Sequence, residues 1–261
     1  MSAGHLVLIP TYNTGARLKE TVLSALSAWA QVWVVVDGSD DGSDRALDAL
    51  AEAHPGFKLL RKPENGGKGS AVFHAARRAL EAGFTHALVM DADGQHPGAS
   101  VEPLMRLSIE DPDAVVMGQP VFGHEVPKAR LYGRRLTIFW TELETLRAGL
   151  GDTLFGMRVY PLRALCEAMR STSFARGYDF DPEVAVRLVW SGVRPVQWPV
   201  PVRYFSKEEG GVSHFNYLRD NVKLTLLHFR LMFLFLAYGW YRSCRAKNAW
   251  NRPAGRATEY S

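Results

Sequence analysis

The chain has 261 residues, of which 47% are apolar and 22% charged, and its formal net charge is +4. This length suits one large α/β domain, or one domain with an appendage, and the composition excludes a disordered chain. Only Cys166 and Cys244 are present, which excludes a disulfide framework and fits a reducing cytosol. The first ten residues, MSAGHLVLIP, lack a basic segment before a long apolar stretch, so no signal peptide is expected.

The first half of the chain alternates short apolar runs with segments of helical periodicity. The run HLVLIP is stopped by a proline and predicts a buried strand, whereas Leu18, Val22, Leu26 and Trp29 recur at helical spacing. Strands are predicted at 5–10, 31–36, 57–60, 86–90 and 114–118, and helices at 15–30, 43–53 and 67–82. Apolar strands that alternate with helices favour a mostly parallel sheet covered on both faces.

Polar clusters follow four of these strands, at 11–13, 37–39, 65–68 and 91–96. In open sheets of this kind, ligands bind outside the carboxyl ends of the strands, so the four clusters are expected at one rim. The last cluster, DADGQHP, places two carboxylates, an amide and an imidazole within six residues. Either it is a solvated acidic turn, or it holds a divalent cation at a strand end.

Six segments in order resemble a known family: IPTYN, VVVDGSDDGS, NGGKGSA, MDADGQHP, GDTLFGMRVY and YDFDPEVAVRLVWSG. Together they are similar to family 2 glycosyltransferases, and DADGQHP after NGGKG is most similar to the branch of dolichol-phosphate mannosyltransferases and polyprenyl-phosphate glycosyltransferases. The resemblance covers about residues 5–215. It implies a GT-A-type α/β fold, with a nucleotide-sugar-dependent domain at 1–205, a membrane-interface helical segment at 206–247 and a polar tail at 248–261.

The resemblance also implies a role for the acidic cluster. Asp91, Asp93 and Gln95 are expected to hold Mg²⁺ or Mn²⁺ or the donor diphosphate, with Asp93 central to catalysis. A hard cation with oxygen ligands would neutralise charge on the departing diphosphate. His96 precedes Pro97 and is not assigned as a ligand.

Other positions are expected to bind a UDP- or GDP-linked sugar. Tyr12 is expected to stack on the base, unless it packs as core, and Asp37 to accept from base or ribose, in a pocket shaped by Pro10 and Thr11. The family usually has an aspartate where this chain has Val36, which leaves the choice of nucleotide open.

The segment NGGKGSA lacks the Gly-x4-Gly-Lys-Ser/Thr pattern of a P-loop. A glycine turn that opens a helix still presents backbone N–H groups to an anion. Lys68 is therefore expected near the nucleotide, together with Asp91, and the alternative for Lys68 is a solvated side chain.

The second half is expected to bind the acceptor. Arg130, Arg134 and Arg135 suit a phosphate, since arginine pairs bidentately with it, although a basic helix face can simply be solvated. A hydroxyl acceptor would need a general base, for which Asp152 is the first candidate and Asp181 and Glu183 follow. The alternative for Asp152 is a buried pair with Arg158 or a neighbour.

The C-terminal segment is both basic and apolar. Residues 203–252 carry nine Lys and Arg against three Asp and Glu, and the run LMFLFLAYGWY at 231–241 is apolar all round. Phe215, Leu218, Val222, Leu226 and Phe229 trace one helix face. This pattern indicates a helix in a membrane interface rather than a nucleic-acid site; a core helix or an oligomer contact is the alternative.

The sequence thus predicts an inverting glycosyltransferase that moves a sugar to a lipid-linked acceptor, such as a polyprenyl phosphate, at the cytoplasmic face of a membrane. Two alternatives stay open: a glycosyltransferase with a soluble acceptor, and a catalytically silent nucleotide-sugar-binding subunit of a membrane complex. The oligomeric state is undetermined.

Overall fold

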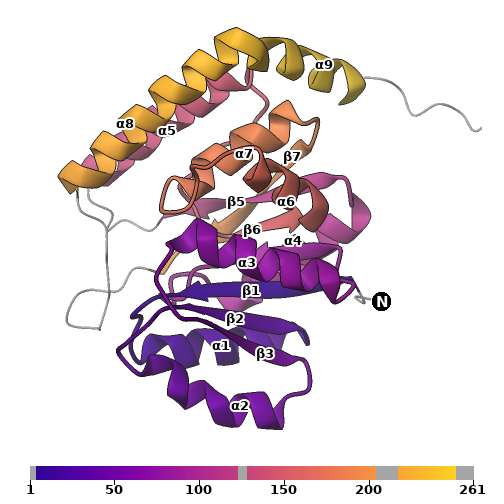
Figure 1. Cartoon of the computed structure of the whole chain (residues 1–261). Coiled ribbons are helices and arrows are strands. Elements are labelled where there is room, and N and C mark those ends of the chain that lie inside the picture. Colours follow the sequence, from indigo (N-terminus) through magenta and orange to yellow (C-terminus); the bar gives the residue numbers. More distant parts are fainter. Residues whose placement is uncertain (1–3, 123–127, 204–216, 251–261) are drawn as a thin grey trace, which may run out of the picture.

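The structure, a computed structural model, describes residues 4–122, 128–203 and 217–250. Its centre is a seven-stranded sheet in the order β3-β2-β1-β4-β6-β5-β7 (Figure 1). The strands are β1 (His5–Thr11), β2 (Val32–Asp37), β3 (Phe57–Lys62), β4 (His86–Val89), β5 (Ala114–Val121), β6 (Arg158–Pro161) and β7 (Arg194–Pro201).

Helices cover both faces of the sheet. They are α1 (Arg17–Ala28), α2 (Asp48–Ala53), α3 (Lys68–Glu81), α4 (Val101–Glu110), α5 (Lys128–Glu144), α6 (Leu162–Arg170), α7 (Phe180–Trp190), α8 (Tyr217–Leu234) and α9 (Trp240–Trp250). Short 3-10 turns at Ser43–Leu47 and Gly98–Ser100 precede α2 and α4, and a π-helical turn, Phe235–Gly239, joins α8 to α9.

The predicted strands and helices are confirmed, with ends that differ by up to three residues. The segment predicted as one helix at 43–53 is a 3-10 turn followed by α2. The strands alternate their side chains between two buried clusters: Leu6 and Leu8 of β1 face one, and Val7 and Ile9 face the other. This two-sided burial explains why the strands are continuous apolar runs.

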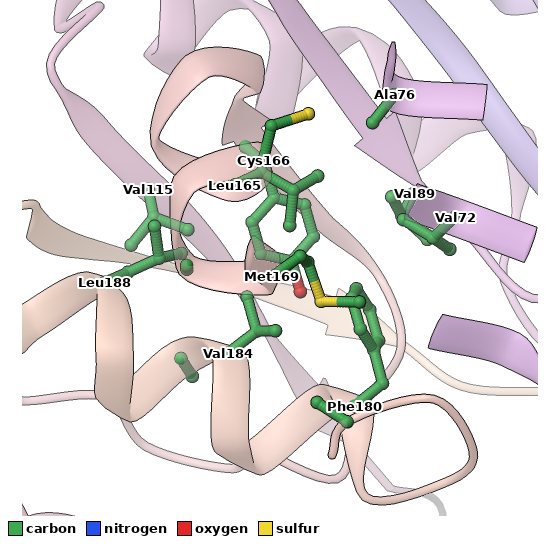
Figure 2. Close-up of a cluster of buried hydrophobic side chains, with 14 of the residues drawn as sticks. Val72, Ala76, Val89, Val115, Leu165, Cys166, Met169, Phe180, Val184 and Leu188 are labelled. Carbon is green, nitrogen blue, oxygen red and sulfur yellow. The ribbon is translucent and has the colours of Figure 1, made fainter. Parts of the chain in front are cut away.

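The first cluster lies between the sheet and helices α3, α6 and α7. Figure 2 shows Val72 and Ala76 of α3 facing Cys166 and Met169 of α6 across this space, with Phe180 closing one end. The second cluster packs α1 and α4 on the opposite face. The sheet is therefore held from both sides, and only its edges and rims are accessible.

Strand β6 is antiparallel to both of its neighbours, β4 and β5, whereas all other pairs are parallel. Arg158, at the amino end of β6, pairs with Val89, at the carboxyl end of β4. Because β6 runs the other way, the segment that precedes it reaches the same rim as the carboxyl ends of the parallel strands. The sequence analysis did not predict this reversal.

The C-terminal helices pack on the domain with one face. Leu227, Leu231 and Phe235 are buried in the first cluster, and α8 lies beside α5 (Figure 1), where His228 Nδ1 is 3.0 Å from Glu144 Oε1. By length and composition alone, Val222–Trp250 could cross a membrane, with mean hydropathy 1.4. The predicted helical appendage is thus present, and its inner face belongs to the core of the domain.

Candidate active site

The loops after β1, β2, β3 and β4 meet at one rim of the sheet, as predicted. Asn13 Nδ2 donates to Asp40 Oδ1 at 2.8 Å, and the Asp40 backbone N–H donates to Asn13 Oδ1 at 3.0 Å, which ties the first two loops together. Thr11 is buried and its hydroxyl lies 2.8 Å from that of Thr14. Pro10 is buried in β1, and Tyr12 is 39% exposed, so the Tyr12 ring borders the rim rather than the core.

The Asp37 carboxylate holds the glycine-rich turn, residues 65–69, by hydrogen bonds. Its carboxylate accepts hydrogen bonds from the backbone N–H groups of Gly66, at 3.1 Å, and Gly67, at 2.7 Å, and also from the ammonium of Lys62. Asp37 is 2% exposed, so these donors account for its carboxylate without a nucleotide. Asp37 therefore holds the turn in place, and its expected contact with base or ribose stays a prediction. Lys62, at the carboxyl end of β3, was not predicted.

Lys68 bridges two carboxylates. Its Nζ lies 2.7 Å from Asp91 Oδ1 and 2.6 Å from Asp181 Oδ2, so it is not a solvated side chain. Burial would lower the pKa of the Lys68 ammonium, but the two carboxylates outweigh burial and raise that pKa. A Cβ on Gly156 would stand 2.2 Å from Asp91 Oδ2 and 2.7 Å from Lys68 Nζ, so only glycine allows this backbone approach. The ion pair fixes the Asp91 carboxylate at the rim.

Asp93 and Asp91 form a crowded pair of carboxylates. Burial, and then repulsion from Asp91, raises the pKa of Asp93, whereas Lys68 and His96 lower the pKa of Asp91 against the effect of burial. The backbone N–H of Gln95 donates to Asp93 Oδ1 at 2.9 Å. A cation would relieve the repulsion between the two carboxylates, so this pair fits a hard divalent ion.

The remaining ligands of such an ion would not be acidic. Within the described residues, no three His, Cys, Asp or Glu side chains group as metal ligands. His96 Nδ1 accepts a hydrogen bond from the Asp91 backbone N–H at 3.2 Å, and its buried ring packs on Phe155. Burial lowers the pKa of His96, so its neutral ring holds the turn in place. Gln95 therefore remains the candidate third ligand.

Asp152 lies beside a separate pocket of about 240 Å³, which also includes Arg134 and Arg135. Asp152 Oδ2 accepts from Arg134 Nη1 at 2.6 Å, and Oδ1 accepts from the Leu154 backbone N–H at 2.9 Å. Of the alternatives considered for Asp152, the structure thus shows a buried pair, and its partner is Arg134 rather than Arg158. Arg130 belongs to α5, but its side chain lies outside the described residues.

Arg158 pairs with the first turn of α7. Its Nη1 donates to the Asp181 carbonyl at 2.7 Å, and the side chain is fully buried. Arg158 and Asp181 are therefore linked to Lys68 and Asp91 in one buried network. The sequence analysis considered Arg158 only as a partner of Asp152, because the direction of β6 was not known.

Glu183 is the one candidate base that the described rim does not contain. It is fully buried; Oε1 accepts from Thr172 and Arg187, at 3.0 and 2.9 Å, and Oε2 accepts from Arg230. Because both oxygens accept from donors, Glu183 has a structural role in this arrangement. Its expected catalytic role stays a prediction.

The fold is a mostly parallel sheet with carboxylates at the carboxyl ends of its strands. A sequence comparison identifies the protein family to which a chain with this arrangement belongs. Residues 6–165, more than half of the chain, match the profile described as "Glycosyl transferase family 2". The chain belongs to the family 2 glycosyltransferases.

Two curated relatives cover most of the chain. The polyprenol monophosphomannose synthase of Mycolicibacterium smegmatis is 29% identical over 214 residues, which are 80% of this chain and 79% of that protein. The undecaprenyl-phosphate mannosyltransferase of Micrococcus luteus is 28% identical over 216 residues, 78% of this chain and 85% of that protein.

Solved structures agree on the fold. A mannosyltransferase from Pyrobaculum calidifontis, solved with GDP-Man and Mn²⁺, has a TM-score of 0.57 at 20% identity and covers 94% of this chain and 74% of that one. S. aureus TarS, solved with UDP-GlcNAc, has a TM-score of 0.56 at 15% identity and covers 87% and 66%. These likenesses confirm the GT-A-type fold.

Proposed function

We propose that this glycosyltransferase transfers a sugar, with inversion, from a nucleotide-sugar to a polyprenyl phosphate at the cytoplasmic face of a membrane. The observation that carries the proposal is the strand direction at the Arg134 pocket: β4 and β5 are both antiparallel to β6, so the carboxyl end of β5, which contributes Gln119 and Pro120 to the pocket, lies at the same rim as Asp91. The names of the relatives from M. smegmatis and M. luteus, which are polyprenyl-phosphate sugar transferases, support the same acceptor class.

The donor would lie along the rim formed by β1 to β4. Tyr12 offers an exposed ring for the base, and the amino end of α3, which begins at Lys68, presents backbone N–H groups toward phosphate. Asp91, Asp93 and Gln95 would hold Mg²⁺ or Mn²⁺ against the diphosphate. When bound, the ion would act as a Lewis acid for the departing nucleoside diphosphate.

The acceptor phosphate would enter the pocket at Asp152. Gln119, Pro120, Phe122 and Ile138 complete its lining beside Arg134 and Arg135. Arg134 can turn from the Asp152 carboxylate toward a phosphate, because a guanidinium forms charge-assisted hydrogen bonds with either anion. The phosphate oxygen attacks the anomeric carbon as the bond from that carbon to the diphosphate oxygen breaks.

This reaction does not need a base. A phosphate monoester is already an anion at neutral pH, so no proton has to leave it during the attack. Asp152 accepts from Arg134 and from the backbone of Leu154. We propose that Asp152 orients Arg134. Only with a hydroxyl acceptor would Asp152 act as a base.

The membrane contact would be the outer face of the C-terminal helices. Val222, Leu226, Phe229, Phe233, Leu236 and Trp240 are all exposed there. Three of these belong to the apolar face that the sequence traced, and the basic side chains of Arg242 and Arg245 follow at the end of the face. An apolar face with a basic border suits an anionic lipid surface.

A panel of nucleotide-sugars tests the proposal. The full chain is incubated with each nucleotide-sugar and with Mg²⁺ or Mn²⁺, in the presence or absence of a membrane lipid extract. One donor should be consumed faster with lipid, and the sugar should move into the organic phase. Consumption that is independent of lipid and metal for every donor would contradict the proposal.

A further inference from the structure

The segment 171–179, between α6 and α7, lies directly against the glycine-rich turn. Its Arg176 carbonyl accepts from the Ser70 backbone N–H at 3.1 Å. A Cβ on Gly69 would stand 2.1 Å from the Ala175 carbonyl oxygen, and one on Gly67 would stand 2.5 Å from that of Arg176. Backbone packs on backbone here, so a shift of the segment moves the turn that carries Lys68.

Local hydrogen bonds give this segment its shape. Asp179 accepts from the backbone N–H groups of Ala175, at 3.0 Å, and Gly177, at 2.9 Å. Ala175 has a φ of 60°, a left-handed conformation that costs energy for a residue with a Cβ. The surrounding contacts must therefore hold this conformation in place.

Some of these contacts come from α8, which is remote from the segment in the sequence. Glu183 Oε1 accepts from the Thr172 hydroxyl at the start of the segment, and Glu183 Oε2 accepts from Arg230 of α8. The Arg230 guanidinium also lies 3.7 Å from the ring centroid of Phe174, within the segment. Arg230 thus touches the segment directly, through Phe174, and indirectly, through Glu183.

We propose that Arg230 is a positioning residue for donor binding: with Glu183 and Phe174 it holds the segment 171–179 against the turn Gly67–Ser70. The proposal rests on the donor site described above. It links the C-terminal helix, whose outer face is assigned to the membrane, to the turn that presents Lys68 and the amino end of α3. Arg230 contacts no part of the rim itself and acts through the segment.

Nucleotide affinity and stability, measured on the same variants, test this role. UDP and GDP are titrated into the full-length chain by calorimetry with Mn²⁺ present, and thermal unfolding is followed by circular dichroism. Arg230→Met should weaken binding of the preferred nucleotide about tenfold, a typical coupling between distant sites. Lys223→Met removes a charge from the exposed side of the same helix and should bind as the wild type does.

A variant of the partner ring separates positioning from folding. Arg230→Met leaves the buried Glu183 carboxylate short of a donor, which lowers stability. Phe174→Ala removes the ring that Arg230 contacts and leaves the charges of Glu183, Arg187 and Arg230 paired, so the melting temperature should stay at the wild-type value while nucleotide affinity falls about tenfold. Arg230→Lys keeps the charge and should recover most of the affinity.

The outcomes are distinguishable. Wild-type affinity in Arg230→Met, with only a lower melting temperature, would make Arg230 a structural clamp and overturn the inference. Wild-type affinity in Phe174→Ala would overturn it too, because the contact between Arg230 and the segment would then have no effect on binding. If the wild type bound neither nucleotide, the proposed donor site itself would fail.

Discussion

The Asp93 carboxylate lies close to that of Asp91 and accepts a hydrogen bond from the backbone N–H of Gln95. Burial and the charge of Asp91 both raise the pKa of Asp93, which means that they disfavour its ionised form. A bound cation would stabilise that ionised form. Asp93→Ala should leave the fold intact and reduce transfer by about a thousandfold or more, since a metal supplies several kcal/mol to the transition state. Steady-state assays with saturating Mn²⁺ measure this.

Asp113→Ala is a suitable control, because Asp113 is exposed and directly precedes β5, at the end of the strand opposite the rim. The control should keep wild-type activity and metal response. An active Asp93→Ala enzyme, or a wild type that keeps full activity in excess chelator, would show that the metal assignment is wrong.

Arg134 and Asp152 give opposite predictions for the two acceptor classes. With a phosphate acceptor, Arg134→Ala loses a charge-assisted hydrogen bond of about 1.5–3 kcal/mol, roughly 10- to 150-fold in rate. Asp152→Asn should then keep appreciable activity, since an amide oxygen can still accept from Arg134. With a hydroxyl acceptor, Asp152→Asn should cost on the order of 10²–10⁴ and Arg134→Ala little. Rates of both variants, measured with the same lipid fraction, decide between these cases.

His5 provides a pH-dependent contribution to stability, remote from the site. Its ring stacks on His86 at 4.4 Å, and burial, together with the charge of His86, lowers the pKa of His5 to about 4 from 6.5. The folded state resists protonation of His5, so its contribution is complete above pH 6.5 and is lost as the pH falls toward 4. The loss should be on the order of 1–3 kcal/mol.

The test compares denaturant unfolding of the wild type and His5→Gln between pH 7.5 and about 4. The difference in free energy of unfolding between the two proteins should shrink as the pH falls through this window, because glutamine does not titrate. A difference that stays constant with pH would refute the assignment to His5.

At the scale of elements, the two faces of α8 and of the π-helical turn that follows it differ in burial. Leu231 is fully buried against the domain, whereas Phe233 and Leu236 are 71% and 73% exposed. Phe233→Ser with Leu236→Ser should lower binding to anionic vesicles by about 10²- to 10⁴-fold, since each buried apolar side chain contributes about 1.5–3 kcal/mol. Vesicle sedimentation at physiological salt measures this, and the melting temperature should hardly change.

Leu231→Ser is the matched control on the inner face. It should lower the melting temperature through a core defect, while any folded protein still binds vesicles. Equal vesicle binding by the wild type and the outer-face double variant would reassign that face to an oligomer contact. The inner-face packing also means that a chain cut before α8 would lose Leu227, Leu231 and Phe235 from the core, so substitution is the cleaner test.

For the whole molecule, local patterns predicted the first five strands, three helical segments and the rim at which their loops meet. Apolar runs and helical spacing depend on residues near in sequence, so they can be read without the fold. The antiparallel β6 could not be predicted in this way, since strand direction depends on distant pairing. The Lys68–Asp181 and Arg134–Asp152 pairs were missed for the same reason: they join residues that the strand order brings together.

Functional roles were harder to assign than positions. Asp91, Asp93 and Gln95 share the turn after β4, whereas the carboxylates of Asp37 and Glu183, which were predicted to bind or catalyse, accept hydrogen bonds from buried donors. A sequence shows that a carboxylate is present but not which donors surround it. Only the packing of α7, α8 and the glycine-rich turn revealed those donors.

Transfer to a defined lipid tests the central claim most directly. Vesicles that contain a polyprenyl phosphate are compared with vesicles that contain the polyprenol of the same length, using the full chain, Mn²⁺ and the labelled sugar donor found in the panel. The account predicts incorporation of label into the phosphate lipid and none into the alcohol, because the Arg134 pocket recognises the phosphate. Equal labelling of both lipids, or labelling of neither while the donor is bound, would contradict it.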